Sequence, residues 1–245
     1  MSSTKPFAFD TIKDFDNHIA QSIPNYDLLC EAIISIAPYF LYENTAVIDL
    51  GCSTGNIMEQ LEHQGTKYGY DISRNLLPKD HDNCVYALKD IADDNFQMPE
   101  QSSLVLSIFT MQFLPRSQRP QLMKKIYNSL IEGGAFIWAE KVHAESSFWE
   151  HTLTSSHYDF KHKAFTSEEI LDKERDLRGM MRLQTSDQNM SMARNVGFEN
   201  STLLWKFYNF ECHILMKEKT FDPTLLWNIF AKENNAGLLY ANDVE

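Results

Sequence analysis

The chain has few cysteines, and no pattern among them favours a metal site. Its four cysteines, Cys30, Cys52, Cys84 and Cys212, are scattered over 245 residues, with no Cys-x-x-Cys pair and no histidines at ligand spacing. This distribution argues against a zinc site and against a disulfide framework. We therefore expect no metal and four buried free thiols.

Long hydrophobic runs and a leader pattern are also absent. No apolar run approaches the roughly 18 residues that a membrane span needs. The first residues, MSSTKP, lack the charged-then-apolar order of a signal peptide. These absences predict a cytoplasmic protein with no membrane contact.

Positive charge is scarce. The chain has 22 Lys and Arg residues against 34 Asp and Glu residues, for a net charge of −12. A protein that grips nucleic acid usually shows a basic patch, and none is evident here. Basic residues are densest over 161–182, but they alternate with acids there, which predicts a solvated helical face. The acidic balance favours a small cationic or zwitterionic ligand over direct nucleic-acid binding.

Through the first 140 residues, continuous apolar runs alternate with segments whose apolar residues recur at helical spacing. Strands are predicted over 45–50, 68–71, 84–88, 104–109 and 135–140. Helices are predicted over 26–36, over 56–63 with Gly65 as its end, and from Ser117 to Gly133-Gly134. The segment 72–82 contains Pro78 and is short for a crossover helix. Alternation of this kind predicts an α/β fold with a doubly wound, Rossmann-like parallel sheet.

The pattern changes after the fifth strand. Helices predicted over 147–155, 168–181 and 187–195 form a helical insertion over 142–197 that is placed to cover a site. Short runs at 201–205 and 209–216 predict a C-terminal antiparallel hairpin. We expect one domain over 1–245, with residues 1–20 as an arm or lid and 217–245 as an extension that contains an appended helix.

The chain is organised around the stretch Val47–Gly55, which holds the end of the first predicted strand and the turn that follows it. Asp49 lies one residue before that turn. Glycines at such a turn let the backbone approach a ligand, and the first amides of the next helix point into the same space. Asp71 follows about 20 residues after Gly51, the spacing at which an acid reaches ribose hydroxyls. Asp90 ends the third strand, where it can accept from an adenine amino group. Helix capping is the alternative role for both acids.

The charge of the pocket limits which nucleotide ligands it can bind, because three acids surround it: Asp49, Asp71 and Asp90. A pyrophosphate would be repelled there, so a cationic adenosine is favoured over a dinucleotide. S-adenosylmethionine (SAM) carries that charge. The turn and its acids therefore predict a SAM site.

Several stretches support a family resemblance. Asp49–Gly55 resembles the cofactor motif of class I SAM-dependent methyltransferases. Other stretches resemble the carboxy-SAM synthases that serve tRNA wobble-uridine modification: Ser22-Ile23-Pro24-Asn25-Tyr26, Phe109-Thr110-Met111-Gln112-Phe113-Leu114, Glu140-Lys141, His157-Tyr158-Asp159-Phe160-Lys161 and Phe207-Tyr208-Asn209-Phe210. The resemblance runs from about residue 9 to residue 217.

This resemblance implies a specific reaction. The carboxylate of prephenate is transferred to the sulfonium methyl group of SAM by way of a sulfonium ylide that captures carbon dioxide, and phenylpyruvate is released. Prephenate or another small acceptor would be the second substrate. The expected partners also include a second copy of this chain, in a homodimer. Carried over by position, the residues that the resemblance implies for cofactor binding are Tyr26, Gly51, Cys52, Ser53, Asp71, Asp90 and Ile91. The predicted cofactor site also includes Asp49, Gly55, Ile72 and Ile108.

Two positions depart from the family pattern. Ile108 stands where the family has an asparagine in the fourth strand. Glu174 stands, in an ungapped alignment, where the family has the arginine that pairs with the new carboxylate, and Arg175 is the next residue. The candidate catalytic residues are Arg175, Glu174 and Tyr26.

Three explanations of these departures stay open: a one-residue slip that brings Arg175 into the role, use of unmodified SAM, or a different second substrate. The bound form is therefore SAM or carboxy-SAM. A conventional methyltransferase acting on a small molecule or tRNA, and a SAM-binding homologue without turnover, are the alternative functions.

Overall fold

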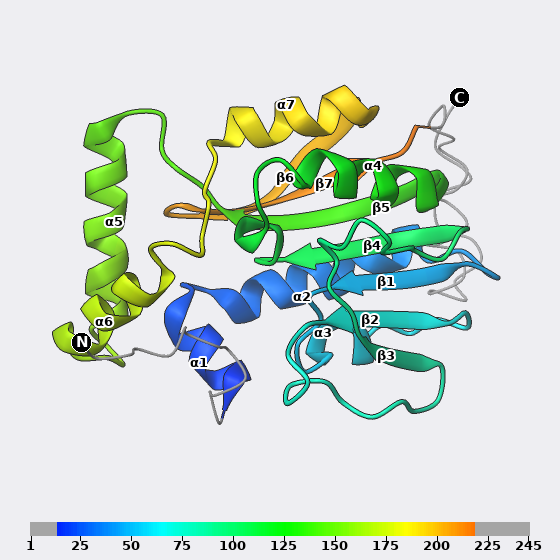
Figure 1. Cartoon of the computed structure of the whole chain (residues 1–245), viewed down its shortest axis with the longest axis horizontal. Coiled ribbons are helices and arrows are strands. Elements are labelled where there is room, and N and C mark those ends of the chain that lie inside the picture. The colour runs from blue at the N-terminus through cyan, green and yellow to red at the C-terminus, as the bar shows by residue number, and fades with distance from the viewer. Residues whose placement is uncertain (1–13, 219–245) are drawn as a thin grey trace, which may run out of the picture.

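The computed structural model describes residues 14–218, which form a seven-stranded sheet with helices on both faces (Figure 1). The strands are β1 (Ala46–Leu50), β2 (Lys67–Asp71), β3 (Cys84–Leu88), β4 (Ser102–Ile108), β5 (Leu130–Lys141), β6 (Asn200–Phe207) and β7 (Phe210–Met216). The α-helices are α1 (Phe15–Ser22), α2 (Tyr26–Ile36), α3 (Asn56–Glu59), α4 (Arg119–Ser129), α5 (Ser147–Lys161), α6 (Ser167–Leu177) and α7 (Ser186–Val196), and the 3-10 turns are η2 (Ala37–Phe40) and η3 (Met111–Phe113).

The sheet has the order β3-β2-β1-β4-β5-β7-β6. Strands β1 to β5 pair in parallel, whereas β7 pairs antiparallel with both β5 and β6. The chain order reverses beside β1, and ligands of such sheets bind where the carboxyl ends of the strands flank that reversal. The predicted doubly wound sheet with a final antiparallel hairpin is therefore confirmed.

Both faces of the sheet are buried, which explains the continuous apolar runs of the central strands. Val47 and Leu104 point to the face covered by α2 and η2. Ile48 and Val105 point to the opposite face, covered by α4 and α7. Each strand thus contributes alternate residues to two separate cores.

The helices after β5 divide into two groups. In Figure 1, α5 and α6 stand beyond the carboxyl ends of the parallel strands, while α7 lies against α4 over the sheet. The hydroxyl of Thr166 and the side chain of Glu169 form a capping box that starts α6. Of the insertion expected over 142–197, only the part that carries α5 and α6 covers the strand ends.

Several predicted helix ends are wrong. Helix α3 stops at Glu59 and does not reach Gly65, whose position against the backbone oxygen of Thr45 leaves no room for a side chain. Helix α4 stops at Ser129, because Gly133 and Gly134 already belong to β5. No helix forms within 72–82.

The remaining expectations concern the cysteines, the two ends of the chain and membrane crossing. All four cysteines are free and buried, as predicted. The first 13 residues of the expected arm, and the expected extension beyond residue 218, lie outside the described residues. Within residues 14–218, no helix combines the length and apolarity that crossing a membrane requires.

Candidate functional site

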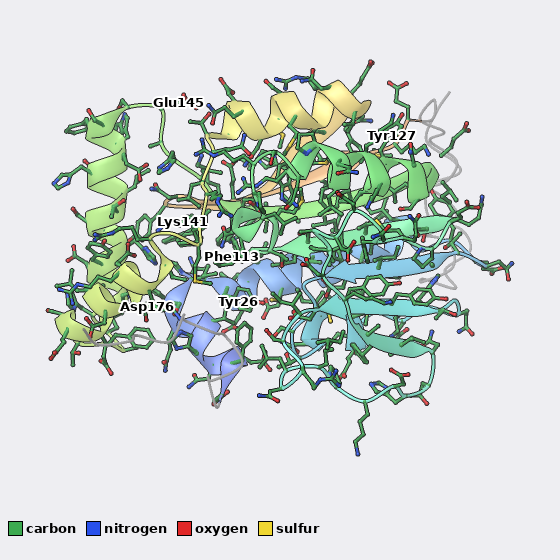
Figure 2. All side chains as sticks on the ribbon, viewed as in Figure 1. Tyr26, Phe113, Tyr127, Lys141, Glu145 and Asp176 are labelled. Atoms are coloured by element: carbon green, nitrogen blue, oxygen red, sulfur yellow. The ribbon has the colours of Figure 1, made fainter. Side chains whose placement is uncertain are left out.

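A cavity of about 540 Å³ opens at the carboxyl ends of the parallel strands. Its volume lies within the range of small-molecule sites, roughly 300–1,000 Å³. Figure 2 shows Tyr26, Phe113 and Lys141 between these strand ends and the α5–α6 pair. Helix α1 contributes a further wall through Phe15, Asp16 and Ile19.

The turn after β1 has the backbone that its glycines suggest. Gly51 has φ +82°, and a Cβ there would lie 2.8 Å from the Cβ of Thr110. Gly51 lines the cavity, whereas Gly55, with φ +75°, packs against the ring of Tyr86 instead. Helix α3 has only 4 residues, so it is shorter than predicted, and the contact of its first amides with a ligand stays a prediction.

Asp71 holds this turn in place while it faces the cavity. The backbone N–H of Ser53 donates to Asp71 Oδ2 at 2.9 Å, and the N–H of Ser73 donates to Oδ1 at 2.7 Å. Each carboxylate oxygen keeps a second lone pair for a ligand hydroxyl. Capping and ligand binding are therefore compatible at Asp71. Asp90 also lines the cavity, and its Oδ1 accepts from the N–H of Ala92 at 2.8 Å.

Asp49 is the most buried acid of the cavity, with only 4% of its surface exposed. Burial, and then the nearby charge of Asp71, raise the pKa of Asp49 to about 7. A cation bound beside it would favour the ionised carboxylate. Asp49 is thus suited to a positively charged ligand.

Apolar and aromatic side chains line the space between the acids. Ile91 is buried, Ile108 is half-buried, and Ile72 lies at the rim with 69% of its surface exposed. The ring centroid of Tyr26 lies 6.4 Å from that of Phe109. Burial raises the pKa of Tyr26 well above its ordinary value, so its phenol keeps its proton.

The residues present fit a SAM molecule. Cys52 and Ser53 both line the cavity, and the hydroxyl oxygen of Ser53 is buried without a hydrogen-bond partner. An unpaired buried hydroxyl is costly, and a polar atom of a ligand would satisfy it. The acids, the apolar walls and this hydroxyl together suit a cationic nucleoside.

Three lysines line the opposite side of the cavity, and sequence reasoning missed them. Lys141 ends β5, Lys161 ends α5 and Lys173 lies on α6. The prediction of a solvated face over 161–182 is wrong for Lys161 and Lys173. The Glu140-Lys141 and His157–Lys161 stretches that carried the family resemblance were the signal that could have revealed two of them.

The two candidate residues on α6 separate in space. Glu174 lines the cavity, and its Oε1 lies 4.0 Å from Lys161 Nζ. Arg175 does not line the cavity; its side chain is 67% exposed and forms an ion pair with Asp172. Successive helical residues point about 100° apart, so one of the two faces outward. The expectation that Arg175 could reach the reacting groups is not met in this structure.

Gln112 is another residue that sequence reasoning missed. Its side-chain Oε1 accepts from the N–H of Lys141 at 2.8 Å, and its own N–H donates to Glu140 Oε1 at 3.2 Å. These bonds tie the turn after β4 to the end of β5. Gln112 also lines the cavity. Its hydrogen bond to the N–H of Lys141 fixes the backbone position from which Lys141 enters the site.

His157, by contrast, is buried in a structural contact. Its Nε2 lies 2.8 Å from the backbone oxygen of Ser22. Burial lowers the pKa of His157 to about 3, so the ring is neutral and donates this hydrogen bond. His157 also lines the cavity, and its contact joins α5 to the end of α1, two of the helices that wall the cavity.

Comparison with known proteins identifies the family of this chain. A family model described as a methyltransferase domain matches residues 47–134. A carboxy-S-adenosyl-L-methionine synthase of Sulfurimonas denitrificans is 31% identical over 224 residues, which cover 87% of this chain and 95% of the relative. The synthase of Staphylococcus epidermidis is 30% identical over 221 residues, which cover 84% and 94%.

Solved structures resemble the chain in fold. Phosphoethanolamine N-methyltransferase 2 of Haemonchus contortus, in complex with SAM, matches with a TM-score of 0.57 and 15% identity over 87% of this chain and 60% of that chain. Human N-acetylserotonin methyltransferase matches with a TM-score of 0.52 and 12% identity over 79% and 53%. The chain belongs to the carboxy-S-adenosyl-L-methionine synthase family of SAM-dependent transferases.

Proposed function

We propose that this protein converts SAM and prephenate into carboxy-SAM and phenylpyruvate. The observation that carries the proposal is the opposite charge of two sides of one cavity. Acids lie near the carboxyl ends of β1 and β2 and just after β3, where a cationic nucleoside is expected, and lysines on β5, α5 and α6 line the other side of the cavity. A sulfonium cofactor and an anionic second substrate would each meet complementary charge.

The acids and the turn hold SAM in this proposal. Asp71 accepts from the ribose hydroxyls, Asp90 accepts from the adenine amino group, and Ile91 packs beside the ring. Asp49 faces the positively charged part of the ligand, and the Ser53 hydroxyl gains a partner. Each of these side chains lines the cavity, which supports the assignment.

Bound SAM would supply a methyl carbon made acidic by its sulfonium group, onto which the ring carboxyl group of prephenate would be transferred as carbon dioxide. The proton lost from the methyl carbon and the hydroxide lost from prephenate would leave together as water, with phenylpyruvate as the other product. The protein contributes orientation and charge in a site sheltered from water. Helices α1, α5 and α6 provide the shelter, since residues from all three wall the cavity. Tyr26, protonated and half-buried, orients the cofactor from α2.

One observation favours a second candidate, a conventional methyltransferase acting on a small molecule. No arginine lines the cavity among the residues that the structure describes, and Glu174 lies where a carboxylate would otherwise be paired. In that case unmodified SAM is the cofactor. The homodimer and the cytoplasmic location stay predictions.

A labelling experiment separates the candidates. The protein is incubated with SAM labelled in its methyl group and with prephenate. Retention of the label on a nucleoside that has gained a carboxyl group supports the proposal. Transfer of the label to an acceptor indicates a methyltransferase, and binding of SAM without either product indicates a homologue without turnover.

A further inference from the structure

Three lysine side chains converge on the cavity from three different elements. Lys141 enters from the end of β5, Lys161 from the end of α5 and Lys173 from α6. Lys161 is only 6% exposed, and Lys141 and Lys173 are half-buried. Buried ammonium groups are costly unless they are paired.

Among residues 14–218, two acids on α6, Glu169 and Glu174, line this side of the cavity. Glu169 lines the cavity, but its carboxylate accepts from both the N–H and the hydroxyl of Thr166, at 2.8 Å each. Glu174 is the remaining lining acid on α6, and its Oε1 lies 4.0 Å from the Nζ of Lys161.

Burial lowers the pKa of all three lysines, and acids oppose the shift in each case: Glu174 and Glu150 at Lys141, Glu174 at Lys161 and Asp176 at Lys173. Burial lowers the pKa of Lys161, and the charge of Lys141 lowers it further while Glu174 opposes the shift. Burial, and then the charge of Lys161, lower the pKa of Lys173 to about 8. An additional anion among these nitrogens would relieve the repulsion.

We infer that Lys141, Lys161 and Lys173 form the subsite that binds the carboxylate groups of the second substrate, and that Glu174 is an internal counter-ion that weakens this subsite. The inference rests on the proposed function for the identity of the substrate. It assigns the substrate's charge to lysines rather than to an arginine. It also gives Glu174 a role, because a carboxylate beside Lys161 reduces the charge offered to a dianion.

Binding can be measured without turnover. The protein is saturated with S-adenosylhomocysteine, which lacks the methyl group, and titrated with prephenate or phenylpyruvate in a calorimeter. Lys161→Met and Lys141→Met are expected to weaken prephenate binding roughly tenfold or more, the effect of losing a hydrogen bond to a charged group. Glu174→Gln is expected to strengthen it several-fold.

The matched control is Lys163→Met. Lys163 follows α5 two residues after Lys161, but it is exposed and does not line the cavity. This variant should bind prephenate like the parent protein. Two lysine variants are used because the loss of Lys161 leaves Glu174 without its ion pair, whereas the Lys141 variant leaves that pair intact.

Each outcome of the titration has a defined meaning. If neither Lys161→Met nor Lys141→Met weakens prephenate binding, or if the parent protein binds neither anion, the subsite is refuted. If both variants lose affinity for the cofactor analogue instead, the lysines hold the nucleoside and the inference is wrong. If anions bind as expected but no carboxy-SAM forms, the proposed function fails while the subsite stands.

Discussion

Replacing Gly51 with alanine should damage the turn on which the whole site depends. Gly51 has φ +82°, a conformation that costs an L-residue about 1–2 kcal/mol. The new Cβ would also lie 2.8 Å from the Cβ of Thr110 and closer still to its Oγ1 and Cγ2. Thr110 must then leave its rotamer, at about 0.5–1.5 kcal/mol. Because that rotation leaves the Cβ of Thr110 in place, the backbone of the turn must shift as well.

That displacement has a further cost. The hydroxyl of Thr110 donates to the backbone oxygen of Ile108 at 3.2 Å, and this bond contributes about 1 kcal/mol. The backbone strain, the rotamer change and the lost bond together amount to at least about 3 kcal/mol. At about 2–4 °C per kcal/mol for a chain of this size, the melting temperature should fall by roughly 6–12 °C.

Thermal unfolding followed by circular dichroism measures this change, and Gly179→Ala is the matched control. A Cβ at Gly179 meets nothing within 4 Å, so that variant should change the free energy of unfolding by less than about 0.5 kcal/mol. Equal melting temperatures for the two variants would refute the close packing of Gly51 on Thr110. Gly51→Ala should also lose SAM binding, while Gly179→Ala should retain it.

Three further predictions concern the acids of the cavity and one helix end. Burial raises the pKa of Asp49 to about 7, and a bound cation favours the ionised carboxylate, so the affinity for SAM should rise with pH through that value. Calorimetry should detect the release of a proton on binding. If Asp49→Asn shows the same pH profile as the parent protein, the prediction is contradicted. Asp71→Asn should weaken SAM binding roughly tenfold or more, since one amide oxygen cannot replace two carboxylate acceptors, whereas Asp93→Asn in an exposed turn should not. Gly197→Ala, with φ +116° and a Cβ 2.7 Å from the ring of Tyr127, should lower the melting temperature but leave SAM affinity unchanged, and a loss of affinity would tie α7 to the site.

The sheet could be predicted from the sequence because its cores impose a simple pattern. The apolar runs around Ile48 and Val105 are long enough to cover both faces of a strand, and the order of strands and helices then leaves few topologies. Helix ends were harder to predict. Gly133 resembles a helix terminator, yet the chain leaves the helix at Ser129 and carries the glycine into β5.

The acidic side of the site was predictable, and the lysine side was not. The parallel sheet brings together Asp49, Asp71 and Asp90, because each lies near the carboxyl end of a strand. Lys161 and Lys173 lie on helices beyond the sheet, where local sequence indicates an exposed face. Only the packing of α5 and α6 over the strand ends turns these two side chains inward.

The central claim is that one cavity brings a carboxyl group from prephenate to the methyl carbon of SAM. The most direct measurement uses prephenate with heavy carbon in its ring carboxyl group, together with SAM, followed by mass spectrometry of the nucleosides. We predict a carboxylated nucleoside that carries the heavy carbon, formed along with phenylpyruvate. Unchanged SAM, or a nucleoside without the heavy carbon beside a methylated acceptor, would contradict the account.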